Sequence, residues 1–170
     1  PPPVSPAGTA TFRSLRIRNF RLFFIGQWIS QTGNWLTMVT QTLLVLKLTS
    51  SGVALGLLTA CQFGPVLLLG AWAGAVADRA DKQRLLIVLQ ALAMAQSFAL
   101  GALVLSGHAS VPAVYRLATV QGVLTAFDNP ARRSFVVEMV PGEDRANAVS
   151  LNSALMTGSR VIGPAAAGAL

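Results

Sequence analysis

The chain has 170 residues, of which 53% are apolar and only 11% are charged, and its mean hydropathy is +0.59. A soluble domain of this size covers its core with roughly 25% charged residues, so this composition argues against a soluble globular domain and indicates a membrane protein. The net charge of +7 does not indicate a nucleic-acid partner, because the basic residues lie between apolar runs and form no basic patch on a soluble frame.

Residues 1–19 are predicted to be a cytoplasmic tail. The first part of this segment is Pro-rich and has no hydrophobic periodicity, which is typical of disorder, and a cluster of Arg follows it. The next apolar run is too long for the core of a signal peptide, so we do not expect it to be cleaved. Because the sequence starts at Pro1 and stops at Leu170 inside an apolar stretch, we expect a fragment of a longer chain.

Five apolar runs follow, and each is predicted to be a transmembrane helix of a bundle at residues 20–170. About 20 apolar residues in a helix cross the hydrocarbon core of a bilayer, which is roughly 30 Å thick. The predicted spans are residues 22–46, 52–77, 85–105, 111–127 and 146–170. The stretch from Asp128 to Arg145 is predicted to be a polar connection between the last two. The fold class is therefore an all-α membrane protein with five transmembrane helices.

The basic residues predict the orientation of these spans, because cytoplasmic loops of membrane proteins are enriched in Lys and Arg. The tail, the second loop and the fourth loop contain Arg13, Arg16, Arg18, Arg21, Arg79, Lys82, Arg84, Arg132, Arg133 and Arg145. The opposite side has only Lys47 and Arg116. The N-terminus is therefore predicted to be cytoplasmic.

Polar residues recur every three or four positions along the first span and so lie on one face of the helix. They are Gln27, Ser30, Gln31, Asn34, Thr37 and Gln41. A face in contact with lipid would not tolerate them. The stripe forms either interhelical hydrogen bonds, worth about 0.6 kcal/mol each, or the wall of a hydrated substrate cavity.

Small residues recur at four-residue spacing in the second span, at Gly52, Gly56, Ala60 and Gly64. Such a seam lets another helix backbone approach closely, so we predict a packing role for it. Pro65 follows directly and should bend the helix, because it removes a backbone donor.

The fifth span carries Arg160 about thirteen residues into its apolar run, on one face with Ser153, Thr157 and Pro164. An Arg at such depth costs at least about 2.5–3.5 kcal/mol unless it faces water or a partner. We therefore assign Arg160 and Thr157 to the predicted cavity. The alternative is a structural role in which Arg160 donates to backbone carbonyls.

No catalytic, nucleotide-binding or metal-binding motif occurs in the sequence. GxxxxGK[ST], HExxH and GxSxG are missing, Cys61 is the only Cys, and the single His108 lies in a short turn. We therefore expect neither an enzyme nor a protein with a cofactor or a bound metal.

The segment GAVADRADKQR joins the second and third predicted spans and resembles a loop signature of the major facilitator superfamily. Gly74, Asp78, Arg79 and Lys82 match that signature, whereas Asp81 stands in place of its second Gly. In the family, an acid and a nearby basic residue of this loop join an acid at the end of span four and latch the cytoplasmic gate. The resemblance therefore implies a gating cluster of Gly74, Asp78, Arg79, Lys82 and Asp128, in which Asp78, Lys82 and Asp128 are the interacting charges. The alternative is a solvated loop whose acids are incidental.

Three further segments are similar to the branch of drug and siderophore exporters that includes enterobactin and macrolide efflux proteins. They are FRLFFIGQWISQTGNWL in span one, FDNPARRSF after span four, and SRVIGPAAAG, with Gly163 and Pro164 as packing residues, in span five. The resemblance implies a twelve-helix fold, of which this chain holds the spans before span six, with the substrate site between two six-helix halves. The missing C-terminal half is then a partner of the bundle, together with the lipid bilayer.

Two residues depart from the family's pattern. Ala118 stands where the superfamily often has an Arg, and Asn34 stands where many exporters of this branch have an acid. No carboxylate lies in the middle of a predicted span. Proton coupling, which the resemblance implies, would then use groups outside these spans.

The sequence thus predicts a secondary transporter of the inner membrane that exports drugs or siderophore-like small molecules with the proton gradient. An importer of nutrients with the same fold and a membrane scaffold subunit that does not transport are the alternatives.

Overall fold

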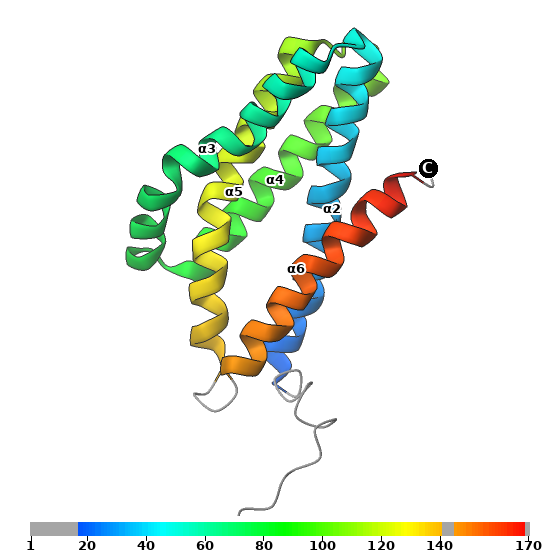
Figure 1. Ribbon diagram of the computed structural model, residues 1–170. Helices are drawn as coiled ribbons and strands as arrows, with labels where there is room; N and C mark the ends of the chain where they lie inside the picture. Colours follow the sequence, from blue (N-terminus) through cyan, green and yellow to red (C-terminus); the bar gives the residue numbers. More distant parts are fainter. Residues whose placement is uncertain (1–16, 141–144, 169–170) are drawn as a thin grey trace, which may run out of the picture. The chain divides into compact units, whose positions relative to one another are not determined.

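The computed structural model describes the backbone of residues 17–140 and 145–168, and the side chains of residues 17–140 and 147–159. Every regular element in these ranges is an α-helix, as the sequence predicts (Figure 1). The five helices are α2 (Arg18–Thr49), α3 (Gly52–Arg79), α4 (Lys82–Leu105), α5 (Val111–Met139) and α6 (Arg145–Gly168).

Short polar turns separate consecutive helices. Ser50 and Gly107 adopt positive φ angles of 49° and 73°, which reverse the chain after α2 and α4. Gly takes this left-handed conformation without steric strain, whereas a residue with a Cβ does not. Figure 1 also shows that α3 curves along its length, as expected for a helix with Pro65 in its interior.

The helices divide into two compact units, residues 36–132 and residues 1–35 with 133–170. The larger unit contains α3, α4 and most of α5, with the second part of α2. Its core consists of Val45, Leu58, Leu100, Val114 and Ala118. The other unit has a core of Phe20, Val136, Val140, Ala148 and Leu151.

Gly122 of α5 lies closely against α3 in the larger unit. A Cβ at this position would lie 2.5 Å from the Gln62 carbonyl oxygen, 2.9 Å from that of Cys61 and 3.0 Å from Cγ of Pro65. Because Pro65 has no N–H, the Cys61 carbonyl lacks its usual helical donor. The Cα–H groups of Gly122 therefore face carbonyl oxygens, a contact that recurs at close helix crossings.

The outer surface of the larger unit is apolar. Leu67, Leu68 and Phe98 are 84%, 84% and 70% exposed. Among the described helices, α3 and α4 are long and apolar enough to cross a membrane. In the most apolar 18-residue stretch of each, only 11% and 17% of the residues are buried. A core helix of a soluble protein would be mostly buried, so these two helices require an apolar surrounding. The prediction of five spans stays a prediction for α2, α5 and α6.

The polar connection predicted after span four is wrong in its first part, because α5 continues without interruption to Met139. The charges and Pro130 had indicated that the span ends before Asp128. Pro130 lies inside the helix, and the charge of Asp128 is paired with Arg132 one turn later. The charged stretch is thus compatible with a helix because its charges meet along one face.

Substitution of Gly122 tests the α3–α5 crossing. Gly122→Ala would place a methyl group within 3.0 Å of two carbonyl oxygens, so the helices must move apart, and we expect a loss of about 1–3 kcal/mol of stability, as for other overpacked cores. Thermal unfolding of the purified protein in detergent measures the effect. Gly101→Ala is the matched control, since nothing lies within 4 Å of a Cβ added at that position. Equal melting temperatures for the two variants would contradict the crossing.

Candidate functional site

The residues of the loop signature lie around the turn between α3 and α4. Asp78 and Arg79 are exposed in the last turn of α3, Lys82 is the half-buried first residue of α4, and Gly74 is half-buried one turn before Asp78. Nothing lies within 4 Å of a Cβ added at Gly74. The structure thus places the four residues that match the loop signature at or near the facing ends of α3 and α4, and their role in a gate stays a prediction.

Two of these charges oppose the helix dipoles. The C-terminal end of a helix carries partial negative charge and its N-terminal end partial positive charge, so that an unfavourable side chain there costs about 0.3–1 kcal/mol. Asp78 stands at the C-terminal end of α3, and Lys82 stands at the N-terminal end of α4. The charge of neither residue therefore stabilises the dipole of its own helix.

Arg79 and Asp81, by contrast, have structural roles. Arg79 is the basic residue in the last turn of α3, where it complements the dipole. Asp81 is the N-cap of α4: its side chain accepts a hydrogen bond of 3.1 Å from the backbone N–H of Arg84, and it also pairs with the guanidinium of Arg84. The cap explains why Asp stands where the loop signature has Gly.

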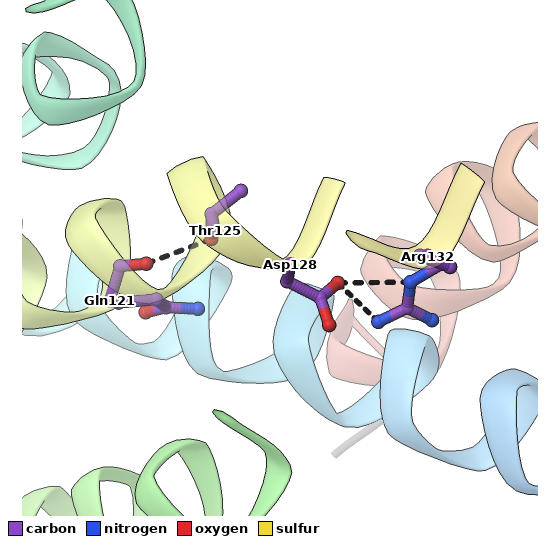
Figure 2. Close-up of polar contacts among 4 residues, drawn as sticks. All are labelled: Gln121, Thr125, Asp128 and Arg132. Carbon is purple, nitrogen blue, oxygen red and sulfur yellow. Dashed lines mark hydrogen bonds and ion pairs between the residues drawn. The ribbon is translucent and has the colours of Figure 1, made fainter. Parts of the chain in front are cut away.

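Asp128, the fifth residue of the predicted cluster, forms an ion pair with Arg132 on the same helix (Figure 2). Both Nε and Nη2 of Arg132 donate to Oδ2 of Asp128, the former at 2.9 Å. The side chain of Arg132 is 1% exposed and that of Asp128 is 13% exposed. In the sequence Arg132 stood out only as a cytoplasmic charge, although its i, i+4 spacing from Asp128 signals this pair.

The same helix carries Gln121 and Thr125 two turns and one turn before Asp128. Figure 2 shows the side chains of Gln121, Asp128 and Arg132 on one side of α5. Thr125 Oγ1 donates to the Gln121 carbonyl at 2.8 Å, which satisfies its hydroxyl within the helix. This face of α5 is therefore polar over about three turns, a feature that was not predicted from the sequence.

The polar stripe of α2 forms interhelical hydrogen bonds at its C-terminal end. Gln62 Nε2 of α3 donates to Gln41 Oε1 at 2.9 Å, and the hydroxyls of Thr37 and Ser97 of α4 lie 3.1 Å apart. Gln41 is fully buried. The sequence left two roles open for the stripe, interhelical hydrogen bonds and a cavity wall. For Gln41 and Thr37 the structure shows interhelical hydrogen bonds.

The remaining residues predicted for the cavity lie in the other unit. Gln27 is 4% exposed, Gln31 and Asn34 are half-buried, and Thr157 is exposed. Arg160, Gly163 and Pro164 lie outside the residues whose side chains the structure describes. The cavity role of this group stays a prediction.

The small-residue seam of α3 has no close neighbour in the described part of the chain. Nothing lies within 4 Å of a Cβ added at Gly52, Gly56 or Gly64. The close helix approach occurs instead at Gly122, against a different face of α3. The predicted packing role of the seam stays a prediction.

No group of three or more His, Cys, Asp or Glu that could hold a metal ion occurs within residues 17–140 and the described part of α6. The described polar groups around the α3–α4 turn and on α5 form ion pairs and hydrogen bonds.

Comparisons with known proteins relate this arrangement to membrane transport. The family described as "transmembrane secretion effector" matches residues 9–170. The chain is 35% identical over 153 residues to the staphyloferrin A transporter of Staphylococcus aureus, a match that covers 88% of this chain and 36% of that protein. It is 28% identical over 145 residues to the uncharacterized MFS-type transporter YfiS of Bacillus subtilis, which covers 85% and 34%. No solved structure matches the chain.

The chain thus spans about a third of the length of these two relatives. Both are described as transporters.

Substitution of Asp81 and of Asp78 tests which charge of the turn stabilises the helices. Asp81→Ala removes the N-cap of α4 and should lower stability by about 1 kcal/mol, whereas Asp81→Asn keeps a capping oxygen and should be nearly neutral. Asp78→Asn should not lower stability, because it removes a charge that opposes the α3 dipole. Unfolding of the three purified variants in detergent measures these differences. A destabilised Asp78→Asn variant would show that Asp78 has a structural role.

Proposed function

The chain belongs to the transmembrane secretion effector family of the major facilitator superfamily, and on this premise we propose that it forms the first five spans of a proton-driven exporter of siderophore-like molecules or drugs. The inner membrane is its proposed location, with the N-terminus in the cytoplasm.

The similarity to the staphyloferrin A transporter is the observation that carries this proposal. At 35% identity over 88% of the chain, it is not limited to one motif. A siderophore or a molecule of similar chemistry is therefore the substrate class that we test first. Import of the same class of molecule is the alternative direction.

The direction of export is supported by the segments that resemble drug and siderophore exporters, whereas the polar residues of the bundle bear on the kind of cargo. Gln27, Gln31, Asn34 and Thr157 offer neutral hydrogen-bonding groups, which suit an amphipathic cargo better than a multiply charged one. In the sequence Arg160 falls within the predicted fifth span, and we expect a carboxylate of the missing half or an anionic group of the substrate to pair with it.

The charge cluster supports a gate at the cytoplasmic end of the bundle. Asp128 lies 17 residues after Val111, which corresponds to about 26 Å along α5. If α5 enters the bilayer at Val111, Asp128 lies close to the opposite edge of a hydrocarbon core of about 30 Å. The charges of Asp78 and Lys82 oppose the dipoles of their own helices. In the proposed gate they lie at the cytoplasmic surface of the membrane, where they can pair with groups that move during transport.

The orientation is tested by labelling single Cys residues. In a Cys61→Ser background with the complete reading frame, Cys introduced at Ser51 or Ser110 should react with an impermeant thiol reagent in intact cells. Cys at Gln83 or Ser134 should react only after permeabilisation, because ten of the loop charges lie on that side. Labelling at Gln83 in intact cells would overturn the orientation.

The gate is tested by removing charge without changing shape. Asp78→Asn should reach the membrane normally but reduce the export of the test siderophore at least severalfold, because Lys82 loses an acidic partner in the outward-facing state. Asp81→Asn removes the same charge from the same turn but retains the cap, so its export should be unchanged. Export and membrane abundance are measured together. Equal export by the two variants would refute the role of Asp78.

A further inference from the structure

Each of the four helices that contribute to the larger unit buries a Gln side chain there. These residues are at most 7% exposed, and they are Gln41 of α2, Gln62 of α3, Gln96 of α4 and Gln121 of α5. A Gln amide has two N–H donors and an acceptor oxygen, and each of them loses its bonds to water when the side chain is buried. Four such amides in a bundle with an apolar surface therefore need partners inside it.

The amides of Gln41 and Gln62 form a pair across the α2–α3 interface, in which Gln62 Nε2 donates to Gln41 Oε1 at 2.9 Å. The amide of Gln96 is satisfied differently, because its Nε2 donates to the backbone carbonyl of Leu117 on α5 at 3.4 Å. The Gln41–Gln62 pair is thus a contact between two side chains, each of which has further hydrogen-bonding atoms.

The pair leaves a donor and an acceptor over. Gln41 Nε2 is buried and has no hydrogen-bond partner within the described residues. The described hydrogen bond of the Gln62 side chain uses Nε2, so that its Oε1 remains available. Rotation of both amides by half a turn would exchange donor and acceptor but leave the same two positions open. Whatever binds there must therefore be able to donate as well as accept a hydrogen bond.

The ligand of this position must also be small, because Gln41 is fully buried. Water meets both requirements, and buried waters in proteins typically make about three hydrogen bonds to polar groups that lack other partners. We propose that the Gln41–Gln62 pair is a binding site for an internal water, which accepts from Gln41 Nε2 and donates to Gln62 Oε1. The site lies within the larger unit and does not depend on the proposed transport function.

Cys61, which precedes Gln62 on α3, is a natural probe of this water. Its side chain packs against the core cluster that contains Val45, one turn after Gln41 on α2. Cys61 is also the only Cys in the sequence. X-rays convert water into hydroxyl radicals, which oxidise a sulfur atom close to the place where they form. A water at the pair should therefore cause oxidation of Cys61 even where lipid excludes bulk water.

The experiment exposes the complete protein in lipid nanodiscs to short X-ray pulses, and mass spectrometry measures the oxidation rate of Cys61. Met94 is the internal reference, because its side chain lies exposed on the apolar surface of α4. Both rates are divided by those of the unfolded protein, which corrects for intrinsic reactivity. Cys61 should then be oxidised at least severalfold faster than Met94. The double variant Gln41→Leu with Gln62→Leu removes the donor and the acceptor, and it should lower the Cys61 rate to that of Met94.

Gln96→Leu is the matched control, since it removes a buried amide that pairs with the α5 backbone, and it should leave the Cys61 rate unchanged. Equal Cys61 rates in the parent and the double variant, or a parent rate no higher than that of Met94, would overturn the proposal. The comparison with Met94 decides alone if the double variant does not reach the membrane.

The same measurement with saturating staphyloferrin A distinguishes water from an oxygen atom of the cargo. The siderophore should leave the oxidation of Cys61 unchanged. Protection of Cys61 would assign the amide pair to cargo binding and overturn the internal water. Because oxidation requires no transport, a protein that is oxidised as expected but exports nothing would refute the proposed function alone.

Discussion

Polar side chains that are buried in a bundle with an apolar exterior must find their partners inside the bundle, and this constraint organises the larger unit. No water competes at a lipid-facing surface, so an unpaired amide or charge is expensive there. Gln41 pairs with Gln62, Thr37 pairs with Ser97, and Arg132 pairs with Asp128. Each of the first two contacts joins different helices, so together they fix α2 against α3 and α4. Leu67, Leu68 and Phe98 meanwhile lie exposed on the outside.

Helix dipoles divide the charges around the α3–α4 turn into two groups. Asp81 and Arg79 stand where the dipoles of α4 and α3 favour them, and the N-cap accounts for Asp81 completely. Asp78 and Lys82 stand where the dipoles oppose them. The proposed gate would use such residues, since a charge that stabilises its own helix cannot change partners at low cost.

The sequence predicted the helical class and most helix ends well, because apolar runs separated by turn residues leave few alternatives. It predicted the α3–α4 turn because the loop signature is local. It did not predict that α5 extends to Met139, since Pro130 and three charges within six residues are usual signs of a loop and only the Asp128–Arg132 pair makes them compatible with a helix. Nor did it predict the crossing at Gly122, because contacts between distant helices leave no periodic pattern within either one.

The proton-driven export of a siderophore-like molecule is the central claim, and uptake into everted membrane vesicles tests it most directly. Vesicles that contain the complete protein would be given a labelled siderophore and a pH gradient with the acidic side inside. Staphyloferrin A is the first choice of siderophore, because a relative is described as its transporter. Proton-driven export should produce accumulation inside everted vesicles, and a protonophore should abolish it. Accumulation that persists without the gradient, or that occurs only in right-side-out vesicles, would contradict it.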